Sequence, residues 1–398
     1  MSSKPILQGL IVVDLTTNIS GPYTTYILSS LGAEVWKVER PIGGDDARGM
    51  SPVVGGTSAY FSVINASKKS IVVDLGTRRG REVLGRLLER ADILVDNFRP
   101  PTTEKLGLSW GKVRRRNPHI VYSSISGFGD AGPDRDRTGF DAVLQARTGI
   151  VSVTGNPGSP PIRVGVSILD LTSGIWAALG ILAALRERDR TGRGQRVSTS
   201  LFETGVFFLG YHLASYQLTG NVPGPQGSSH GAFSPYGAFT TSDGHILIGI
   251  SSDRQFQRLA RALGRQDWLS DPRYRSNVQR VANREELKKE MEKVLSHREA
   301  KYWEDCLLDA EVPATKIQHV DEVLADRQAE ALSLFRSVDL GEKALKIPRI
   351  PLSFRGRGGK EGAARLPRLG QHTREILRRA GYPARETDAL LKGRVVLD

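Results

Sequence analysis

Short apolar runs alternate with amphipathic stretches along the first part of the chain. The runs are typical of strands buried on both faces of a parallel sheet. They occupy residues 10–15, 34–39, 70–75, 92–96 and 119–125. Helix-like segments such as residues 21–31 and 78–90 separate them. This alternation predicts an α/β fold in which a Rossmann-like parallel sheet forms a large domain.

The amino-acid composition of the sequence changes after about residue 220. Residues 220–231 are rich in Gly, Pro and Ser, as is typical of a linker. Beyond them, Asp243-Gly244 separates two strand-like runs and is a strong signal for a hairpin turn. Helix-like stretches then complete the pattern of a smaller, inserted α+β domain. The expected organisation is the first part of a large domain at residues 1–220, a linker at 221–235, a small domain at 236–320, and a return to the large domain at 321–398.

Asp170 is an isolated carboxylate between an apolar run and a long helix-like segment at residues 175–185. An Asp near a helix N-terminus commonly caps the helix, because its side chain accepts hydrogen bonds from unpaired backbone N–H groups. Position alone favours this interpretation. The alternative is a carboxylate held ionised at the mouth of the sheet, where open α/β folds bind their ligands.

Polar and cationic residues follow the predicted strands. The carboxyl ends of parallel strands share one edge of the sheet, which is the usual ligand site of such folds. The residues expected at this edge are Arg40, Asn97, Arg99 and Ser126. The loop after the first strand lacks a G-x-G-x-x-G sequence, which argues against a dinucleotide-dependent dehydrogenase. The glycine-rich loop at residues 40–48 carries two arginines and is suited to phosphate binding, although such loops are common.

The chain of 398 residues carries a formal net charge of +13 at pH 7. Basic proteins attract nucleic acids, anionic membranes or phosphorylated small molecules. The arginines are scattered without a nucleic-acid-binding motif, so we expect a small polyanionic ligand and no nucleic acid. A single cysteine, Cys306, excludes an intramolecular disulfide and favours a reducing compartment. No apolar run approaches the roughly 20 residues of a membrane span, so we expect no membrane association and a cytoplasmic location.

Several short motifs follow one another in order along nearly the whole chain. They lie at residues 14–22, 32–48, 65–74, 96–98, 139–146, 165–174, 191–195, 235–244 and 369–373. Through this set the chain resembles the class III coenzyme A (CoA) transferases, whose relatives include the α-methylacyl-CoA racemases. The resemblance implies transfer of CoA from an acyl-CoA to a free carboxylic acid, with the CoA thioester as a substrate and no bound cofactor. It also implies an interlocked homodimer.

The resemblance also implies roles for individual residues. Asp170 stands where the family has its catalytic aspartate, and Ile19 with Ser20 stands beside the acyl group. Positions that contact CoA in the family correspond to Arg40, Val73, Asp74, Leu75, Gly76, Asn97, Phe98, Arg99, Lys105, Thr138, Gly139, Phe140 and Asp141. Succinyl-CoA is the expected donor, and a C4 or C5 dicarboxylate is the expected acceptor.

Phe140 bears on the choice between a transferase and a racemase. The racemase branch places a histidine at this position as one of two acid–base groups, and phenylalanine cannot move a proton. We therefore expect a transferase, with racemisation as the alternative. With an ordinary pKa of about 3.9, Asp170 is expected to be ionised at neutral pH. It is expected to attack the thioester to give a mixed anhydride and then an aspartyl-CoA thioester.

Overall fold

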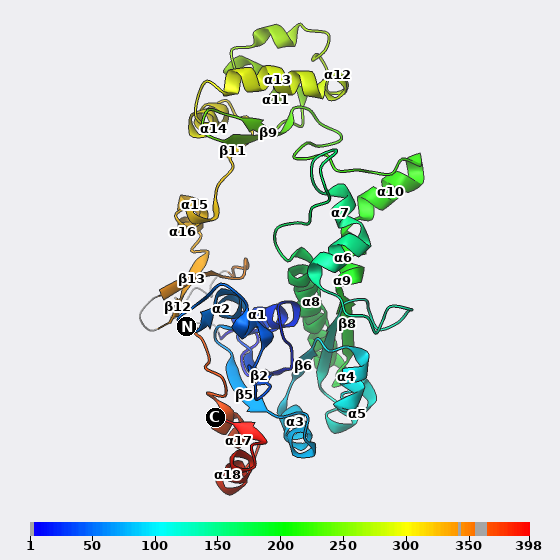
Figure 1. Ribbon diagram of the computed structural model, residues 1–398, viewed down its shortest axis with the longest axis vertical. Helices are drawn as coiled ribbons and strands as arrows, with labels where there is room; N and C mark the ends of the chain where they lie inside the picture. Colours follow the sequence, from blue (N-terminus) through cyan, green and yellow to red (C-terminus); the bar gives the residue numbers. More distant parts are fainter. Residues whose placement is uncertain (1–3, 341–343, 355–363) are drawn as a thin grey trace. The chain divides into compact units, whose positions relative to one another are not determined.

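The computed structural model describes residues 4–340, 344–354 and 364–398, which form two compact units (Figure 1). The first, called here the sheet unit, comprises Met1–Gly149, Gly165–Tyr211 and Gln328–Asp398. The second, called here the hairpin unit, comprises Ile150–Val164 and His212–Arg327. Each unit is described by itself.

A seven-stranded sheet organises the sheet unit, in the order β15-β5-β2-β1-β6-β7-β8. Six strands are parallel, and β15 pairs antiparallel with β5 at one edge. The bounds are β1 (Ile11–Asp14), β2 (Glu34–Glu39), β5 (Lys69–Val73), β6 (Ile93–Asp96), β7 (Val121–Ser126), β8 (Arg196–Ser200) and β15 (Val396–Leu397). The six parallel strands follow the order of a doubly wound Rossmann sheet, so the predicted parallel α/β architecture is confirmed.

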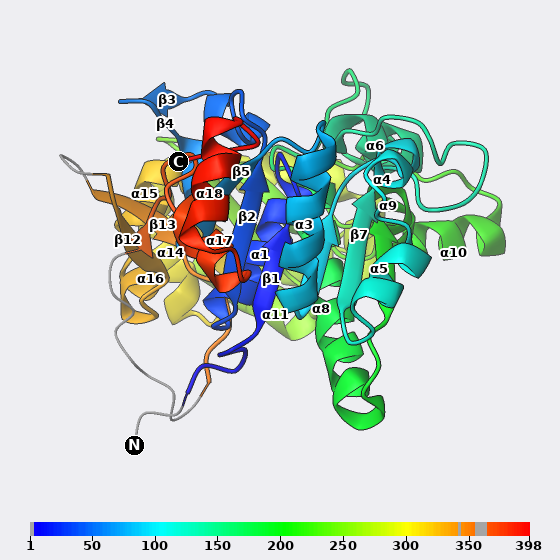
Figure 2. The same cartoon turned by 90° about the horizontal axis from the view of Figure 1, so that it is seen from below.

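Helices cover both faces of this sheet because alternate strand residues point to opposite sides. On one face, Val12 and its neighbours pack against α1 (Ser20–Ser30) and α8 (Ile168–Thr191). On the other face, Val13 belongs to a second core. Its helices are α3 (Arg78–Arg90), α5 (Trp110–Arg116), α17 (Thr373–Arg379) and α18 (Ala384–Lys392), which lie in front of the sheet in Figure 2.

Helix α8 corrects one expectation from the sequence. With 24 residues and a mean hydropathy of 1.8 over its most apolar window, it is long and apolar enough to cross a membrane. The expectation that no segment approaches that length was therefore wrong. Ala178, Ile181 and Ala184 of this helix are buried against α1 and the sheet, as in the core helix of a globular protein.

Smaller elements complete the sheet unit. They are η1 (Asp46–Gly49), β3 (Val53–Val54), β4 (Thr57–Ser58), α2 (Ala59–Asn65), α4 (Pro100–Lys105), α6 (Asp141–Thr148), α9 (Leu201–Phe208), β12 (Phe335–Asp339), β13 (Ala344–Pro348) and β14 (Ala364–Arg365). Two helices, α10 (Gly210–Thr219) and α16 (Arg327–Ala331), run across the boundaries between the units. The strands β12, β13 and β14 form a small sheet whose core residues Val338 and Ile347 pack with Ala66 after α2.

The hairpin unit is built around a three-stranded antiparallel sheet in the order β11-β10-β9. The strands are β9 (Tyr236–Thr240), β10 (His245–Gly249) and β11 (Ala314–Lys316), and the predicted turn at Asp243-Gly244 joins the first two. The helical elements are α7 (Ile150–Val153), α11 (Asp253–Ala262), η2 (Gln266–Leu269), α12 (Asn277–Ala282), α13 (Arg284–Leu295), α14 (Ala300–Asp309) and α15 (Val320–Leu324). Ile246, Trp268 and Leu307 are fully buried in its core.

Candidate active site at the carboxyl edge of the sheet

The loops after β1 and β6 meet where the winding of the sheet changes direction. The Asn97 side chain accepts a hydrogen bond from the Thr17 N–H at 3.0 Å and donates one to the Thr17 carbonyl at 2.7 Å. The buried Asp96 accepts from the Phe98 N–H at 3.2 Å and from the Tyr122 hydroxyl. This is the position at which open α/β sheets bind ligands. The two loops are therefore held together at the expected ligand site.

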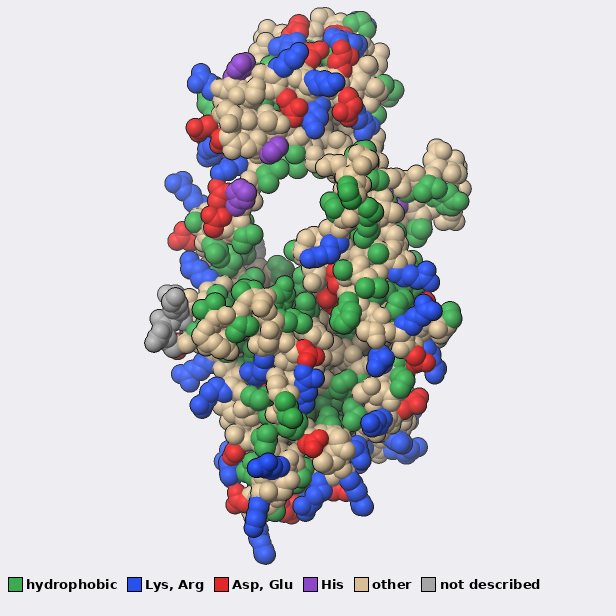
Figure 3. Space-filling view, viewed as in Figure 1, with side chains coloured by type: hydrophobic (Ala, Val, Ile, Leu, Met, Phe, Trp, Pro, Cys, Tyr) green, Lys and Arg blue, Asp and Glu red, His purple; other side chains and the backbone are tan. Residues whose placement is uncertain are grey.

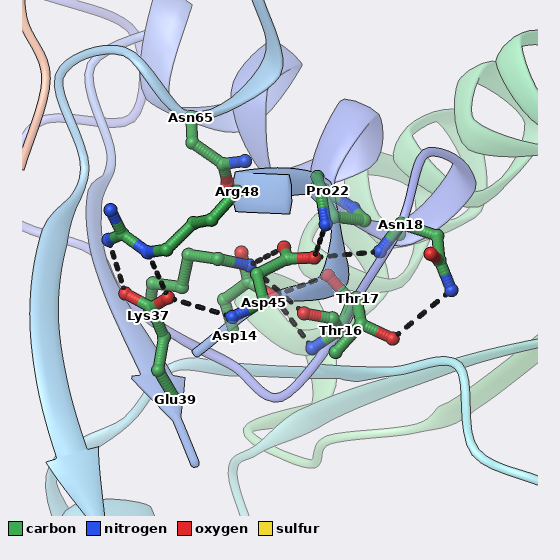
Figure 4. A network of polar contacts seen from close by, with 12 residues as sticks. Asp14, Thr16, Thr17, Asn18, Pro22, Lys37, Glu39, Asp45, Arg48 and Asn65 are labelled. Atoms are coloured by element: carbon green, nitrogen blue, oxygen red, sulfur yellow. Dashed lines mark hydrogen bonds and ion pairs between the residues drawn. The ribbon is translucent and has the colours of Figure 1, made fainter. Parts of the chain in front are cut away.

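Six charged side chains lie beneath these loops and are called here the ionic network: Asp14, Lys37, Glu39, Asp45, Arg48 and Lys68. Figure 4 labels all of them except Lys68. Lys68 is fully buried and donates to Asp14 Oδ2 at 3.1 Å and to the Pro22 carbonyl at 2.9 Å. It also donates to Asn65 Oδ1 at 2.9 Å. One ammonium group therefore ties together the end of β1, the start of α1 and the end of α2.

The other cations of the ionic network hold the glycine-rich loop after β2. Lys37 pairs with Asp45 at 2.7 Å, and both side chains are fully buried. Arg48 donates to both carboxylate oxygens of Glu39, at 2.7 and 2.8 Å. Burial by itself raises the pKa of Asp14, but the charges of Lys68 and Lys37 outweigh it and lower that pKa to about 2. Asp14 is therefore ionised at neutral pH, and the ion pairs of the network fix the loop in place.

Above the network, the carboxyl edge contains a cavity of about 310 Å³. Its lining includes the apolar side chains of Leu75, Phe98 and Leu106, together with Arg40, which is exposed and paired with Asp46. Of the predicted CoA-contacting residues, this cavity brings together Arg40, Val73, Asp74, Leu75, Gly76 and Phe98. Among the described residues, no group of three or more His, Cys, Asp or Glu side chains is arranged to hold a metal ion.

Two predicted cationic contacts lie outside the lining of this cavity. Arg99 immediately precedes α4 and is exposed. Lys105 ends α4 and lines a neighbouring groove. Leu106 lines both the cavity and that groove, so Lys105 stands beside the cavity.

Helices α1 and α8 make a close contact next to Asp170. The Thr24 hydroxyl donates to the Gly174 carbonyl at 3.1 Å, and a Cβ at Gly174 would lie 2.8 Å from the Ser20 carbonyl oxygen. Glycine is therefore required for this approach. Asp170 lies one turn before Gly174 on the same side of α8. This places it near the N-terminus of α1, which begins after Ile19 with Ser20.

Asp141, and not Asp170, caps α8. Asp141 is the first residue of α6, and its Oδ2 accepts from the Leu169 N–H at 2.7 Å and from the Asp170 N–H at 3.2 Å. Its Oδ1 accepts from the Gln145 side chain. The interpretation of Asp170 as a helix cap was therefore wrong. Its backbone is held by Asp141, and its own carboxylate forms no hydrogen bond or ion pair with the residues that the structure describes.

The environment of Asp170 changes its ionisation. Burial disfavours the carboxylate, and the negative charge of Asp141 adds to the effect, so the pKa of Asp170 is raised to about 7. The expectation of an ordinary pKa near 3.9 was wrong for this reason. At neutral pH, roughly half of the molecules carry the anion. A carboxylate with a raised pKa is also a more basic nucleophile than one that is stabilised by a cation.

The remaining predicted residues lie in the loop before α6. Gly139 packs against Gly127, because a Cβ on either one would approach the Cα of the other to 3.0 Å. Thr138 is exposed, and Phe140 leaves 64% of its surface accessible. This loop therefore places an apolar side chain in solvent directly before the residue that caps α8.

Sequence reasoning missed Thr17 and the ionic network below it. The available signal was a set of charged residues inside or at the ends of apolar runs, such as Asp14 and Lys37. Charges at such positions are rarely buried without partners. The partners come from other segments, so their pairing could not be read from any one motif.

Comparisons with known proteins extend over nearly the whole chain. Residues 7–373 match the model of a family described as CoA-transferase family III. The chain is 35% identical to the acetyl-CoA:oxalate CoA-transferase of Acetobacter aceti, over 92% of this chain and 94% of that protein. It is 36% identical to the succinyl-CoA:mesaconate CoA-transferase of Haloarcula hispanica, over 94% and 96%. The crystal structure of a CAIB/BAIF family protein from Brucella suis superposes with a TM-score of 0.85 at 33% identity, covering 95% of this chain and 100% of that one.

Proposed function

Because the chain belongs to CoA-transferase family III, we propose that it moves CoA from an acyl-CoA thioester to a free carboxylic acid with Asp170 as the nucleophile. The observation that carries this proposal is the carboxylate of Asp170 itself. It is partly buried, lacks a cationic partner among the described residues and has a pKa raised to about 7. It lies in the first turn of α8, at the same edge of the sheet as the cavity.

The reaction then proceeds in two pairs of steps. The Asp170 carboxylate attacks the thioester carbonyl, the carbon–sulfur bond breaks, and a mixed anhydride and the CoA thiolate form. The thiolate attacks the aspartyl carbonyl, which releases the donor acid and leaves an aspartyl-CoA thioester. The acceptor carboxylate attacks this thioester, and the same two steps run in reverse. Asp170 returns unchanged, so it serves as a covalent catalyst.

The nucleotide end of CoA occupies the cavity beside Arg40. Leu75, Phe98 and Leu106 offer apolar surface to a base, and Arg40 offers charge to phosphate. The ionic network and the Asn97–Thr17 hydrogen bonds hold the surrounding loops before the ligand arrives. Binding energy gained at this distant end positions the thioester against Asp170.

The acid–base groups near Asp170 favour a transferase over a racemase. Racemisation requires a second group that moves a proton to and from the α-carbon. Phe140 cannot do so, and the carboxylate of Asp141 is engaged by two backbone N–H groups and Gln145. Exchange of the α-hydrogen for deuterium in an acyl-CoA, with no acceptor acid present, would identify the racemase instead.

The substrates proposed are succinyl-CoA as donor and a C4 or C5 dicarboxylate as acceptor. The names of the two relatives support a dicarboxylate, because oxalate and mesaconate are both dicarboxylic acids. Incubation with a panel of acyl-CoA esters and free acids, followed by mass spectrometry, would identify the pair that exchanges CoA. Hydroxylamine added during turnover should convert Asp170 to a hydroxamate, and an unmodified Asp170 would contradict the covalent route.

We also propose that the enzyme acts as a homodimer, in the interlocked form that the class III resemblance implies. A single chain leaves apolar side chains of α8 and α9 exposed, including Trp176 and Phe207, whose rings meet edge to face at 5.4 Å. Exposed apolar clusters of this kind are typical of subunit contacts. Native mass spectrometry at micromolar concentration should give twice the mass of the chain.

A further inference from the structure

Three parallel strands of the central sheet end in the same way. In β1, β5 and β6, a run of three aliphatic residues is followed by an aspartate: Asp14, Asp74 or Asp96. The Oδ1 atom of each aspartate accepts a hydrogen bond from the backbone N–H two residues further on, which forms an Asx turn. The residues that donate these hydrogen bonds all line the cavity: Thr16, Gly76 and Phe98. Each turn therefore leads the chain from the end of a strand into the cavity wall.

The three aspartates differ in how their charges are balanced. Asp14 forms an ion pair with Lys68, and Asp74 is partly exposed to solvent. Asp96 is fully buried and forms no ion pair with any residue that the structure describes. Burial raises the pKa of Asp96 to about 6, although its hydrogen bonds act in the opposite direction. A buried carboxylate without a cationic partner costs stability, and such groups are concentrated at functional sites.

Hydrogen bonds from the neighbouring strand fix the Asp96 side chain. The Tyr122 hydroxyl donates to Oδ2, and the Ser124 hydroxyl donates to Oδ1 at 3.2 Å. Ser124 is the residue of β7 that pairs with Asp96, and Tyr122 lies on the same face of the sheet two residues earlier. The carboxylate cannot turn away without leaving buried donors unpaired, which is costly. The turn that carries Phe98 is thereby tied to the middle of the sheet.

We propose that Asp96 is a positioning residue for the ligand in the cavity. Asp96 does not line the cavity itself, so it acts through the two residues that follow it. Its turn holds Phe98 in the cavity wall and sets Asn97 so that both of its hydrogen bonds reach Thr17. This role rests on the proposed function, in which the cavity takes the nucleotide end of CoA. A wall that is already ordered costs less to bind than one that must be ordered by the ligand, so the role should appear as affinity.

The test measures the affinity of the full-length protein for CoA by isothermal titration calorimetry. Asp96→Ala removes every acceptor of the turn and should weaken CoA binding about 5- to 10-fold. Asp96→Asn should bind within about twofold of wild type, because its side-chain oxygen still accepts from Phe98 and its amide group can donate to the Tyr122 hydroxyl. A role in stability alone would lower the Tm of the Ala variant and leave its affinity for CoA unchanged at a temperature where it is folded.

Asp92→Ala is the matched control at the other end of the same strand. Asp92 directly precedes β6, accepts a hydrogen bond from the Ile11 N–H at 2.9 Å and pairs with Arg188 at 3.1 Å. Its loss should lower the Tm and leave the affinity for CoA unchanged, because these contacts lie at the amino edge of the sheet.

Tyr122→Phe is a milder variant that keeps the ring and removes one donor to Asp96. It should weaken CoA binding about two- to threefold, and it decides the question if Asp96→Ala does not fold. Wild-type affinity in both the Asp96→Ala and Tyr122→Phe variants would overturn the positioning role. So would equal losses in Asp96→Ala and Asp92→Ala, or in Asp96→Ala and Asp96→Asn. A wild-type protein that binds no CoA would instead contradict the proposed function itself.

Discussion

The ionic network and the Asp141–Asp170 pair lie at the same edge of the sheet but differ in how their charges are balanced. In the network, three cations face three carboxylates, and the pKa of Asp14 is lowered to about 2 despite its burial. In the pair, one carboxylate faces another with no cationic partner among the described residues, and the pKa of Asp170 is raised to about 7. Burial acts in the same direction on both aspartates, so the neighbouring charges decide the outcome.

This difference separates a structural role from a chemical one. A compensated network is costly to disturb and holds its side chains in one arrangement. A buried carboxylate without a cationic partner is available for reaction and costs the fold some stability. Substitutions in the ionic network should therefore lower mainly stability, whereas substitution of Asp170 should lower activity.

The largest effect is expected on activity at the uncompensated group. Asp170→Asn removes the nucleophile and keeps the size of the side chain, so CoA transfer should fall by roughly 10³-fold or more. The rate of CoA exchange between a donor thioester and an acceptor acid measures this. Asp136→Asn, which neutralises an exposed aspartate in the loop after β7, is the control and should keep the wild-type rate. Retention of full activity by the Asp170 variant would remove this residue from the mechanism.

The next largest effect is expected on stability in the ionic network. Lys68→Met leaves Asp14 buried with one of its two cations lost, and breaking such a pair costs about 3–5 kcal/mol. Urea unfolding should show this loss. The double variant Lys68→Met with Asp14→Asn should recover part of it, because the unpaired charge is then absent.

The neighbouring lysine provides the control for this prediction. Lys69 forms ion pairs with Glu34 and Glu375, but 28% of its side chain is accessible to solvent. Solvent screens such pairs, so Lys69→Met should cost less than about 1 kcal/mol. Equal losses for the two lysines would contradict the special role of the buried one.

The sequence predicted the central sheet well and its additions poorly. β2 spans the predicted residues 34–39, because a strand buried on both faces has a strong and local pattern. The family match over residues 7–373 also confirms the resemblance to class III CoA-transferases. By contrast, β15 has two residues and is a strand only through its pairing with β5. The small sheet of β12, β13 and β14 likewise depends on contacts between distant segments.

The candidate site likewise contains residues whose place could be predicted from the sequence and residues whose place could not. Arg40 and Asn97 follow strands directly, so their presence at the carboxyl edge could be predicted from chain order. The capping of α8 by Asp141 could not, because it depends on how α6 packs against α8 across 28 residues of sequence. The raised pKa of Asp170 follows from that packing, so it could not be predicted from the sequence either.

A smaller effect is expected on the pH dependence of the reaction. Since Asp170 must be ionised to attack, kcat/KM should rise with pH through a midpoint near 7. Asp141→Asn keeps an oxygen for the Leu169 and Asp170 N–H groups and removes the negative charge. The midpoint should then move below that of wild type, because one of the two causes of the raised pKa is gone. An unchanged midpoint would show that burial alone sets this pKa.

The smallest effect is expected on stability at the catalytic position itself. The pKa of Asp170 is higher in the folded chain than in the unfolded chain, so the unfolded state is favoured wherever ionisation differs. This cost is small at pH 4, near the ordinary pKa of the unfolded chain, and grows until the pH passes about 7. Asp170→Asn should therefore raise stability at pH 8 by on the order of 1 kcal/mol, or a few degrees in Tm, and change it much less at pH 4. Thermal unfolding at the two pH values measures this, and a loss of stability at pH 8 would mean that the carboxylate has a stabilising partner, as the aspartates of the ionic network do.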